Sequence, residues 1–475
     1  MSVSNWRDRA SPIVFLSNNL ISRIGVALVT CAGTTWLFFL PTFLQGHAGS
    51  AYVGILLFLL LPATFFAGLV LIPVGMLMQR RRLHGALPAA TGGPVFSWTN
   101  PNFRRLAVFV LAVTGVNMVI GANFTYRAVE HMESVQFCGA TCHVVMKPEF
   151  TAYQNSPHSK VDCVKCHIGP GASWFVQSKL SGTRQLFAVA LNTFERPVPS
   201  PVADLRPARE TCEGCHWPDK YGGDKLKVIS HFNDQGQETK SVLLMKIGGG
   251  GYTRSGIHTA HVGQGVRVRY AHSDRARQNI SWVEYDKGGE KREFFAAKAK
   301  PEDISKMNIR EMDCIDCHNR PSHAFEVPER ALDNAMAARD VVPDLPQIRQ
   351  TALEVIKKSY SSSAQGEQEI PQSVERFYRE KHPDIFAKRQ PDIARSAKGI
   401  LALWQRNVFP EMKVVWGTHV NNIGHNDYPG CFRCHDGEHK TKDGVKAIGQ
   451  DCNSCHVMLA MEETNPKVLK DLGLQ

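Results

Sequence analysis

The pattern that most constrains this chain is a closely spaced pair of cysteines followed directly by histidine, which occurs six times in 475 residues. Five copies read Cys-x-x-Cys-His, and one has an extra residue between its cysteines. Two thiols at this spacing can form thioethers to the vinyl groups of one haem, and the adjacent histidine then lies under the iron as an axial ligand. We therefore predict six covalently attached c-type haems. The motifs, numbered 1 to 6 in chain order, are Cys138-Cys142-His143 (the longer copy), Cys163-Cys166-His167, Cys212-Cys215-His216, Cys314-Cys317-His318, Cys431-Cys434-His435 and Cys452-Cys455-His456.

Zinc sites and disulfides are the two other common uses of paired cysteines. A structural zinc site usually combines two distant pairs, and it does not need a histidine directly after each second cysteine. Closely spaced Cys-x-x-Cys pairs behave as redox couples more than as structural disulfides. Haem attachment therefore explains the repeated pattern best. The remaining cysteine, Cys31, is interpreted as a small residue that packs between helices.

Three uncharged stretches are long enough to cross a bilayer: residues 24–44, 51–78 and 106–124. A spanning helix needs about 20 apolar residues. The first stretch is too long for a cleaved signal peptide, and two more follow it. The sequence therefore predicts three transmembrane helices at the N-terminal end.

The formal net charge of +11 is concentrated at the same end. Residues 1–126 contain eight Arg, no Lys and one acidic residue, whereas the other 349 residues carry 47 basic and 43 acidic groups. This distribution indicates a membrane protein and argues against a nucleic-acid partner. The arginines lie in the N-terminal segment and in residues 79–105, while residues 45–50 carry no charge. By the positive-inside rule, we expect a bacterial inner-membrane protein with a cytoplasmic N-terminus and a periplasmic domain after about residue 124.

A second axial ligand at each iron decides whether a haem only relays electrons or can also bind a substrate. Eleven histidines outside the motifs lie beyond the membrane region, which is enough for every site and favours a relay over an enzyme. His261 and His272 compete with His258, and two of these three are expected to be ordinary surface histidines. His382 and His419 are predicted not to be ligands. The predicted distal ligands are His158, His231, His258, His323, His425 and His439.

Residues 137–180 resemble the NapC/NirT family of membrane-anchored multihaem quinol dehydrogenases. The residues that carry the resemblance are Phe137, Cys138, Cys142, His143, Met146, Tyr153, His158, Cys163, Cys166, His167, Trp174 and Lys179, directly after a membrane helix. In that family the first haem lies against the membrane surface beside the quinol site, has a methionine ligand and is assisted by a nearby lysine. The resemblance implies that Met146 ligates haem 1, that Lys179 contacts quinol and that His158 ligates another haem.

The sequence departs from the family pattern in three respects. The extra residue in motif 1 leaves His143 and Met146 as alternative iron ligands of haem 1. Three membrane helices stand where the family usually has one. The acidic residue near the family's quinol site has no clear counterpart, and Glu149 and Glu195 are candidates. Beyond residue 180 the chain looks like longer inner-membrane multihaem cytochromes used in respiration.

The expected fold is a membrane protein with three N-terminal transmembrane helices and a periplasmic multihaem cytochrome c domain that has little regular structure near the haems. An alternating apolar and polar pattern over residues 226–295 predicts β-hairpins, interrupted at residues 248–251. Helical patterns occur near residues 347–358, 373–381 and 392–406, and Gly366, Pro371, Pro383 and Pro391 are expected to separate them. The predicted divisions are 1–126 (membrane anchor), 127–225 (haems 1–3), 226–300 (β-rich insertion), 301–328 (haem 4), 329–412 (helical segment) and 413–475 (haems 5 and 6).

These features predict a membrane-bound hexahaem cytochrome that takes electrons from menaquinol or ubiquinol, with Lys179 or a carboxylate assisting proton release. The electrons would pass to periplasmic cytochromes or to a membrane respiratory complex, and on to a periplasmic or extracellular acceptor. One alternative is a terminal reductase in which one haem has an open position for a small oxyanion such as nitrite. Another is a relay that runs in reverse and reduces quinone, because direction depends on haem potentials.

Overall fold

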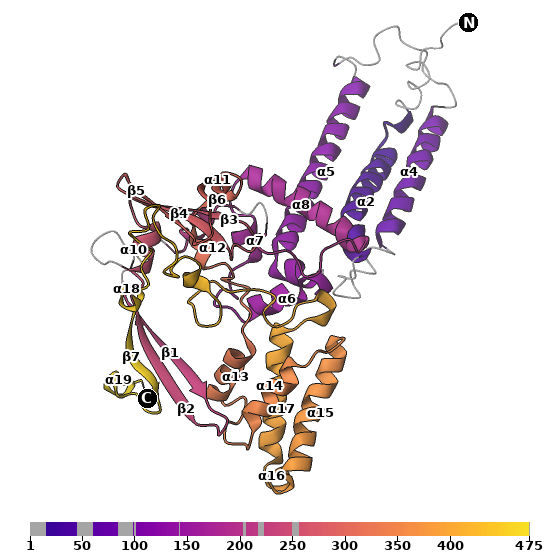
Figure 1. Ribbon diagram of the computed structural model, residues 1–475. Coiled ribbons are helices and arrows are strands. Elements are labelled where there is room, and N and C mark those ends of the chain that lie inside the picture. Colours follow the sequence, from indigo (N-terminus) through magenta and orange to yellow (C-terminus); the bar gives the residue numbers. More distant parts are fainter. Residues whose placement is uncertain are drawn as a thin grey trace. The chain divides into compact units, whose positions relative to one another are not determined.

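The computed structural model describes residues 16–44, 60–83, 98, 101–141, 143–202, 206–216, 223–248 and 256–474. The chain divides into two compact units, Met1–Met132 and Glu133–Gln475. Within the described residues, the first unit consists of long helices, and the second combines two sheets, a group of helices and many irregular segments (Figure 1). This content agrees with the fold expected from the sequence.

Three helices of the first unit are long and apolar enough to cross a membrane. The predicted spans 24–44 and 106–124 lie inside the first and third of them. Of the predicted span 51–78, residues 51–59 lie outside the described ranges, and most of the remainder is in the second helix. The third helix is longer than predicted at both ends. The helices are α2 (Leu20–Leu44), α4 (Leu61–Arg82) and α5 (Pro101–Glu133).

Helices α2 and α4 pack closely because glycines lie where they cross. A Cβ atom on Gly25 would lie 2.7 Å from the carbonyl oxygen of Gly68, so neither position has room for a side chain. The hydroxyl of Ser22 donates a hydrogen bond of 2.9 Å to the carbonyl oxygen of Ile72. This bond satisfies a polar side chain inside an apolar helix pair.

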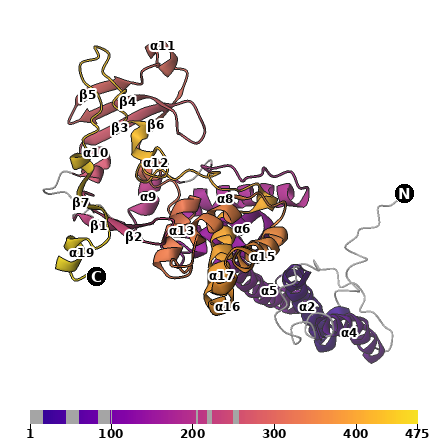
Figure 2. The ribbon, with the colours of Figure 1, turned by 60° about the horizontal axis from the view of Figure 1, so that its bottom comes forward.

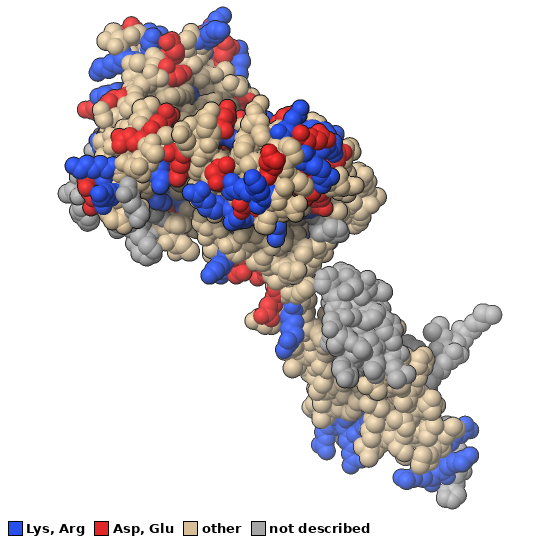
Figure 3. Space-filling model, turned by 90° about the horizontal axis from the view of Figure 1, so that it is seen from below, with Lys and Arg blue, Asp and Glu red and all other residues tan. Residues whose placement is uncertain are grey.

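Arginines gather at one end of the first unit. Arg80, Arg81 and Arg82 occupy the last turn of α4, and Arg104 lies near the start of α5. Arg23, near the start of α2, places its guanidinium 5.7 Å from the ring centre of Phe109 in α5. In Figure 3 the helices of this unit form a broad uncharged surface with clusters of blue side chains toward its end.

The second unit contains two antiparallel sheets with the strand orders β1-β2-β7 and β5-β4-β3-β6. Five strands fall in the region predicted to form hairpins. The other two, the short β6 near motif 4 and β7, which begins at His456 of motif 6, lie at the sheet edges. The strands are β1 (Lys225–Phe232), β2 (Glu238–Met245), β3 (Val266–His272), β4 (Ile280–Lys287), β5 (Glu290–Phe295), β6 (Asn308–Glu311) and β7 (His456–Glu463).

A group of five helices forms the largest hydrophobic core of the second unit, with Trp404, Ile370 and Tyr378 almost fully buried (Figure 2). Pro383 and Pro391 lie in the first turns of their helices, where proline is tolerated. The expectation that Gly366 and Pro371 separate helices is wrong, because both lie inside α15, whose apolar face packs into this core. The helices are α13 (Pro328–Ala337), α14 (Ile348–Lys357), α15 (Ser363–Lys381), α16 (Pro383–Lys388) and α17 (Gln390–Asn407).

The motifs themselves lie on short helices and turns, as expected for a chain folded around cofactors. Among the short elements of the second unit that contain the motifs or connect them, only α6 and α8 exceed ten residues. The elements are the π-helix η2 (Phe137–Thr141), α6 (His143–Gln154), α7 (Cys163–His167), α8 (Ala172–Ala190), α9 (Ala208–Cys212), α10 (Ile257–Val262), α11 (Pro301–Ile304), α12 (Cys314–Cys317), the 3-10 turns η4 (Pro410–Met412) and η5 (Gly430–Arg433), α18 (Cys452–Cys455) and α19 (Lys467–Asp471).

Candidate haem-binding sites

A single helical turn brings the two cysteines of a motif to the same side of the chain. In motif 4 this turn is α12, and the side chain of Asp313 accepts a hydrogen bond from the backbone nitrogen of Cys314 at 2.6 Å. The carboxylate of Asp316, which is 2% exposed, accepts hydrogen bonds from Arg310 and Arg277. In motif 6, Asp451 caps α18 in the same way. Residues next to the cysteines therefore fix the turn that the attachment chemistry requires.

Each of the five motif histidines whose side chain the structure describes lies opposite a second histidine from a distant part of the chain. The distances between ring centres fall between 5.8 and 6.2 Å. The first histidine of each pair below belongs to a motif. The pairs are His167 with His323 (6.2 Å), His216 with His158 (5.8 Å), His318 with His258 (6.2 Å), His435 with His261 (5.8 Å) and His456 with His425 (6.2 Å).

This spacing fits one iron between the two rings of each pair. A histidine nitrogen lies about 2 Å from the metal it ligates, so two rings on opposite sides of one iron have centres roughly 6 Å apart. The two thiols of each motif would attach the porphyrin covalently, and the paired rings would supply the two imidazole ligands that complete the coordination of a six-coordinate c-type haem. The residues present therefore fit the cofactor that the motifs predict.

Hydrogen bonds orient the distal rings of four pairs. The Nδ1 atoms of these rings lie 2.7 to 3.2 Å from backbone carbonyl oxygens. A carbonyl only accepts, so Nδ1 carries the proton and Nε2 is left with a lone pair for a metal. The bonds run from His158 to Pro321, from His258 to Gly248, from His261 to Ile257 and from His323 to Glu149.

Burial also favours the neutral form of these rings, which is the form that ligates a metal. Desolvation is the main cause that lowers the pKa of the motif histidines His167, His318 and His456. The same effect lowers the pKa of His258 and His323 on the distal side.

Thiols connect motif 1 to motif 2 and motif 3 to motif 4. A side-chain hydrogen bond joins Cys138 to Cys163, which lowers the pKa of Cys138 to about 7 and raises the pKa of Cys163. A second such bond joins Cys212 to Cys314, where the pKa of Cys212 is lowered and that of Cys314 is raised. Each pair brings the attachment points of two consecutive motifs into contact.

The other consecutive motifs are also neighbours. Burial raises the pKa of Cys166, Cys317 and Cys455, and a thiol of an adjacent motif raises it further in each case. The adjacent thiol is Cys212 for Cys166, and Cys431 for both Cys317 and Cys455. Motifs 1 to 6 therefore follow one another in space in their sequence order, and α7, α12 and α18 mark this path in Figure 1.

The predicted residues around motif 1 are placed only in part. Cys142 and the side chain of His143 lie outside the described part of the structure, and Met146 is half-buried on α6. Lys179 lies on α8 with its ammonium 4.8 Å from the ring centre of Phe175. After the hydrogen bond from Cys163, the charge of Lys179 is a further cause of the lowered pKa of Cys138, so this lysine lies near motif 1.

The two candidate carboxylates have different surroundings. Glu149 accepts two hydrogen bonds from Nη2 of Arg320, and its carboxylate lies 3.3 Å from Nδ1 of His323. Glu195 is exposed on the segment after α8. Glu149 therefore belongs to the surroundings of the motif 2 pair.

Two predicted ligands, His231 and His439, are not brought to any motif histidine in the described structure. His231 lies on β1 with Nδ1 3.8 Å from the carboxylate of Asp333. His439 is 2% exposed, and its two ring nitrogens contact the Asp436 carboxylate and the Ile280 carbonyl oxygen. Both ring nitrogens of His439 are therefore engaged by protein groups other than a motif histidine.

Sequence reasoning passed over His261, which lies opposite His435. Its spacing of three residues from His258 is the signal that could have identified it, because this spacing places two side chains on one helical turn. His272, the third candidate of this region, is on β3 and contacts the carbonyl oxygen of Asp274 at 2.9 Å. The expected non-ligands have other contacts: His382 reaches Gln347, and the ring of His419 stacks on Phe325 at 5.3 Å.

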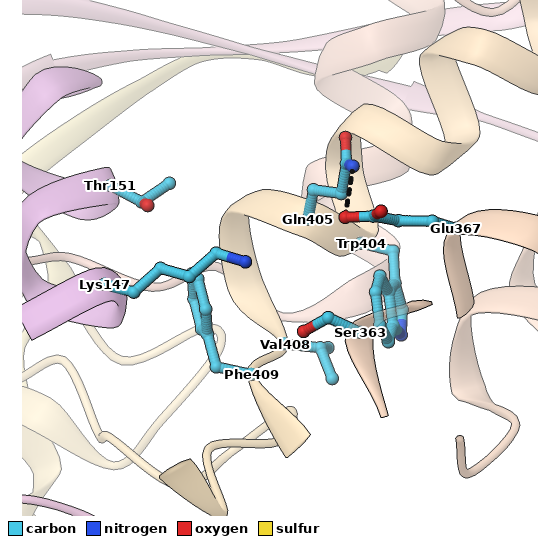
Figure 4. A pocket seen from close by; sticks show the side chains of 8 residues that line it. All are labelled: Lys147, Thr151, Ser363, Glu367, Trp404, Gln405, Val408 and Phe409. Carbon is cyan, nitrogen blue, oxygen red and sulfur yellow. Dashed lines mark hydrogen bonds between the residues drawn. The ribbon is translucent and has the colours of Figure 1, made fainter. Parts of the chain in front are cut away.

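One small pocket, of about 190 Å³, lies between α6 and helices α15 and α17 (Figure 4). Nε2 of Gln405 donates to Glu367 at its edge, at 3.0 Å. No lining residue belongs to a motif or to a histidine pair, so the pocket is separate from the haem-binding sites. The lining residues are Lys147, Thr151, Ser363, Glu367, Trp404, Gln405, Val408 and Phe409.

Membrane helices followed by a series of Cys-Cys-His motifs with paired histidines define a membrane-anchored multihaem cytochrome c. Residues 101–198 match the N-terminal region of the NapC/NirT cytochrome c family. The chain is 37% identical over 465 residues to the cytochrome c-type protein ImcH of Geobacter sulfurreducens, which covers 95% of this chain and 91% of that relative. The chain therefore belongs to the NapC/NirT group of membrane cytochromes c. No solved structure matches it.

These findings confirm the predicted family, the covalently bound haem c and the role in electron transport. The chain is an inner-membrane multihaem cytochrome that relays electrons.

Proposed function

We propose that this cytochrome carries six haems and oxidises membrane quinol, passing the electrons along motifs 1 to 6 to a periplasmic acceptor. The observation that carries the proposal is the unbroken series of neighbouring motifs, which begins directly after the last membrane span and ends near the C-terminus. Bound haem supplies reversible one-electron transfer at each motif.

The histidine pairs support a relay. We assign His323 to haem 2, His158 to haem 3, His258 to haem 4 and His425 to haem 6 as distal ligands. An iron held between two imidazoles has no open position for a substrate. The alternative, a terminal reductase of a small oxyanion, would need an open haem, and no described pair supports one.

The positions of the arginines support a cytoplasmic N-terminus. Arg23, Arg80 and Arg104 lie at the helix ends that the positive-inside rule assigns to the cytoplasm. The described part of α5 then leads toward the periplasm, where haem c is attached in known cytochromes of this type.

Quinol oxidation releases two electrons and two protons for each quinone formed. We place the quinol near motif 1, where the ammonium of Lys179 can hold a quinol oxygen as its proton leaves. Met146, on the neighbouring helix α6, is the proposed iron ligand of haem 1, with His143 as the alternative.

Anaerobic mixing of the purified holoprotein in detergent with menaquinol-1 or decylubiquinol tests the function. We expect the absorption band of reduced haem c to appear, and a pyridine haemochrome assay to give six haems per chain. The proposal is overturned if dithionite reduces the protein and neither quinol does. Oxidation of pre-reduced protein by menadione, without reduction by either quinol, would establish the reverse direction, and turnover with nitrite would establish the reductase.

A further inference from the structure

We propose that one short helix, α10, supplies the distal iron ligands of two different haems, His258 for haem 4 and His261 for haem 5. This inference rests on the proposed haem attachment, but not on quinol as the electron donor. The ring centre of His258 lies 6.2 Å from that of His318, and the ring centre of His261 lies 5.8 Å from that of His435. The two motif histidines belong to segments more than one hundred residues apart, and α10 brings both sites together.

Backbone hydrogen bonds hold α10 at the end of strand β2. The backbone nitrogens of Ile257 and His258 donate to the carbonyl oxygens of Lys246 and Ile247 at 3.0 and 2.8 Å. The nitrogen of Lys246 in turn donates to the carbonyl oxygen of Cys455, at 2.8 Å. Helix α10 is therefore anchored to the sheet that contains both β2 and β7. Strand β7 begins at His456, the histidine of motif 6.

A close approach of two glycines fixes where α10 begins. A Cβ atom on Gly256 would lie 2.5 Å from Cα of Gly248, so the two backbones touch where the chain enters the helix. Gly248 has a φ of +56°, a conformation that favours glycine. Its carbonyl oxygen accepts the hydrogen bond of His258 Nδ1 at 3.2 Å.

Both rings are oriented by local carbonyl groups. His261 Nδ1 contacts the carbonyl oxygen of Ile257, one turn earlier in the same helix, at 2.7 Å. Because each Nδ1 is engaged by a carbonyl oxygen, Nε2 of each ring is left to ligate an iron, and the two rings on one turn serve two different motifs. Because one rigid turn holds both ligands, a displacement of α10 changes the ligation of two adjacent haems at once.

Low-temperature EPR and magnetic circular dichroism of the variants His258→Ala, His261→Ala and the double variant test this assignment. Each single variant should convert one of the five low-spin haems held by histidine pairs into a high-spin haem that binds cyanide, and the double variant should convert two. Added imidazole should restore the low-spin signal, which a general loss of folding would not allow. A His261→Met variant, which keeps a ligand, should raise one midpoint potential.

His272→Ala and His439→Ala are the matched controls, since their rings contact protein carbonyl groups rather than a motif histidine. The inference is overturned if His261→Ala leaves all five of these haems low-spin, or if a control variant produces the five-coordinate haem instead. Gly256→Ala should affect the signals of haems 4 and 5 together. None of these spectra depends on quinol, so they separate failure of this inference from failure of the proposed function.

Discussion

Nη2 of Arg320 donates hydrogen bonds of 3.0 Å to both carboxylate oxygens of Glu149, and this ion pair joins the helix after motif 1 to the segment after motif 4. The side chains of Arg320 and Glu149 are 6% and 15% exposed. His323, the proposed distal ligand of haem 2, donates to the backbone oxygen of the same glutamate at 2.9 Å. A buried ion pair therefore lies directly beside an iron ligand.

Replacing Glu149 by glutamine should destabilise the second unit by about 3 kcal/mol, because it leaves the charge of Arg320 buried without a partner. Urea unfolding followed by circular dichroism of the haem bands measures this change. The matched control is Glu311→Gln, which breaks the exposed pair of Arg267 and Glu311 and should cost less than about 1 kcal/mol. Equal effects of the two substitutions would show that the Glu149 pair contributes no more than a surface contact.

Replacing Lys179 by alanine should slow reduction by menaquinol-1 at least about tenfold while haem content and spectra stay unchanged. The physical reason is the loss of the positive charge near motif 1 that holds the quinol oxygen as its proton leaves. Stopped-flow absorption of reduced haem c gives the rate. Arg184→Ala, which removes an exposed charge from the same helix, serves as the control and should leave the rate within twofold. An unaffected rate in Lys179→Ala would remove this residue from the quinol site.

Substitution of Met146 by histidine should lower the midpoint potential of one haem by an amount of order 0.1 V, within the roughly 0.8 V range that axial ligands set. A methionine ligand raises the haem midpoint potential relative to a histidine ligand, so replacing Met146 by histidine should lower this potential. A spectroelectrochemical titration would show one shifted step among six. Met307→Leu, at a half-buried methionine elsewhere, is the control. If no step of the titration shifts in Met146→His, the result would favour the alternative in which His143, and not Met146, ligates the iron of haem 1.

His419 should make stability depend on pH between about 4 and 6.5. Burial, and after it the charge of Arg320, lower its pKa to about 4, while Glu149 opposes the shift. The unfolded chain, with a histidine pKa near 6.5, then binds more protons than the folded chain in this range. Stability is therefore complete above about pH 6.5 and falls as the pH drops toward 4.

The expected loss from this one histidine is about 2 kcal/mol between pH 7 and pH 5. Urea unfolding at the two pH values should show a smaller difference in His419→Phe than in the wild type. The phenylalanine keeps the stacking on Phe325, which separates titration from packing. An identical pH dependence in both proteins would contradict the assignment.

The haem attachment sites could be predicted from the sequence because their chemistry is local. Two thiols and a histidine must lie within one turn, so the spacing between Cys163 and His167 carries all the required information. The membrane spans could be predicted for a similar reason, since about 20 consecutive apolar residues suffice.

The distal partners could not be predicted with the same accuracy because each is fixed by tertiary structure. His439 lies close to a motif in sequence, but folding directs its nitrogens to Asp436 and Ile280. The sequence does not single out His261 as a ligand, because the surrounding residues alternate as strands do. The chain instead forms the short helix α10 there. The pairing of β2 with β7 joins segments that are more than two hundred residues apart in the chain, a relation that no local pattern contains.

The histidine pairs also set an order for maturation. Under the proposed topology the N-terminus stays in the cytoplasm and the second unit is exported from about residue 133 onward, so a pair can close only after both of its members have been exported. His158 is already outside when His216 emerges, so haem 3 can acquire both ligands at once. Haem 2 has only one of its two histidine ligands until His323 has crossed the membrane. For haem 4, His258 has already been exported when His318 emerges. The interval between export of His167 and of His323 is thus the period in which the growing cytochrome has an iron open to foreign ligands.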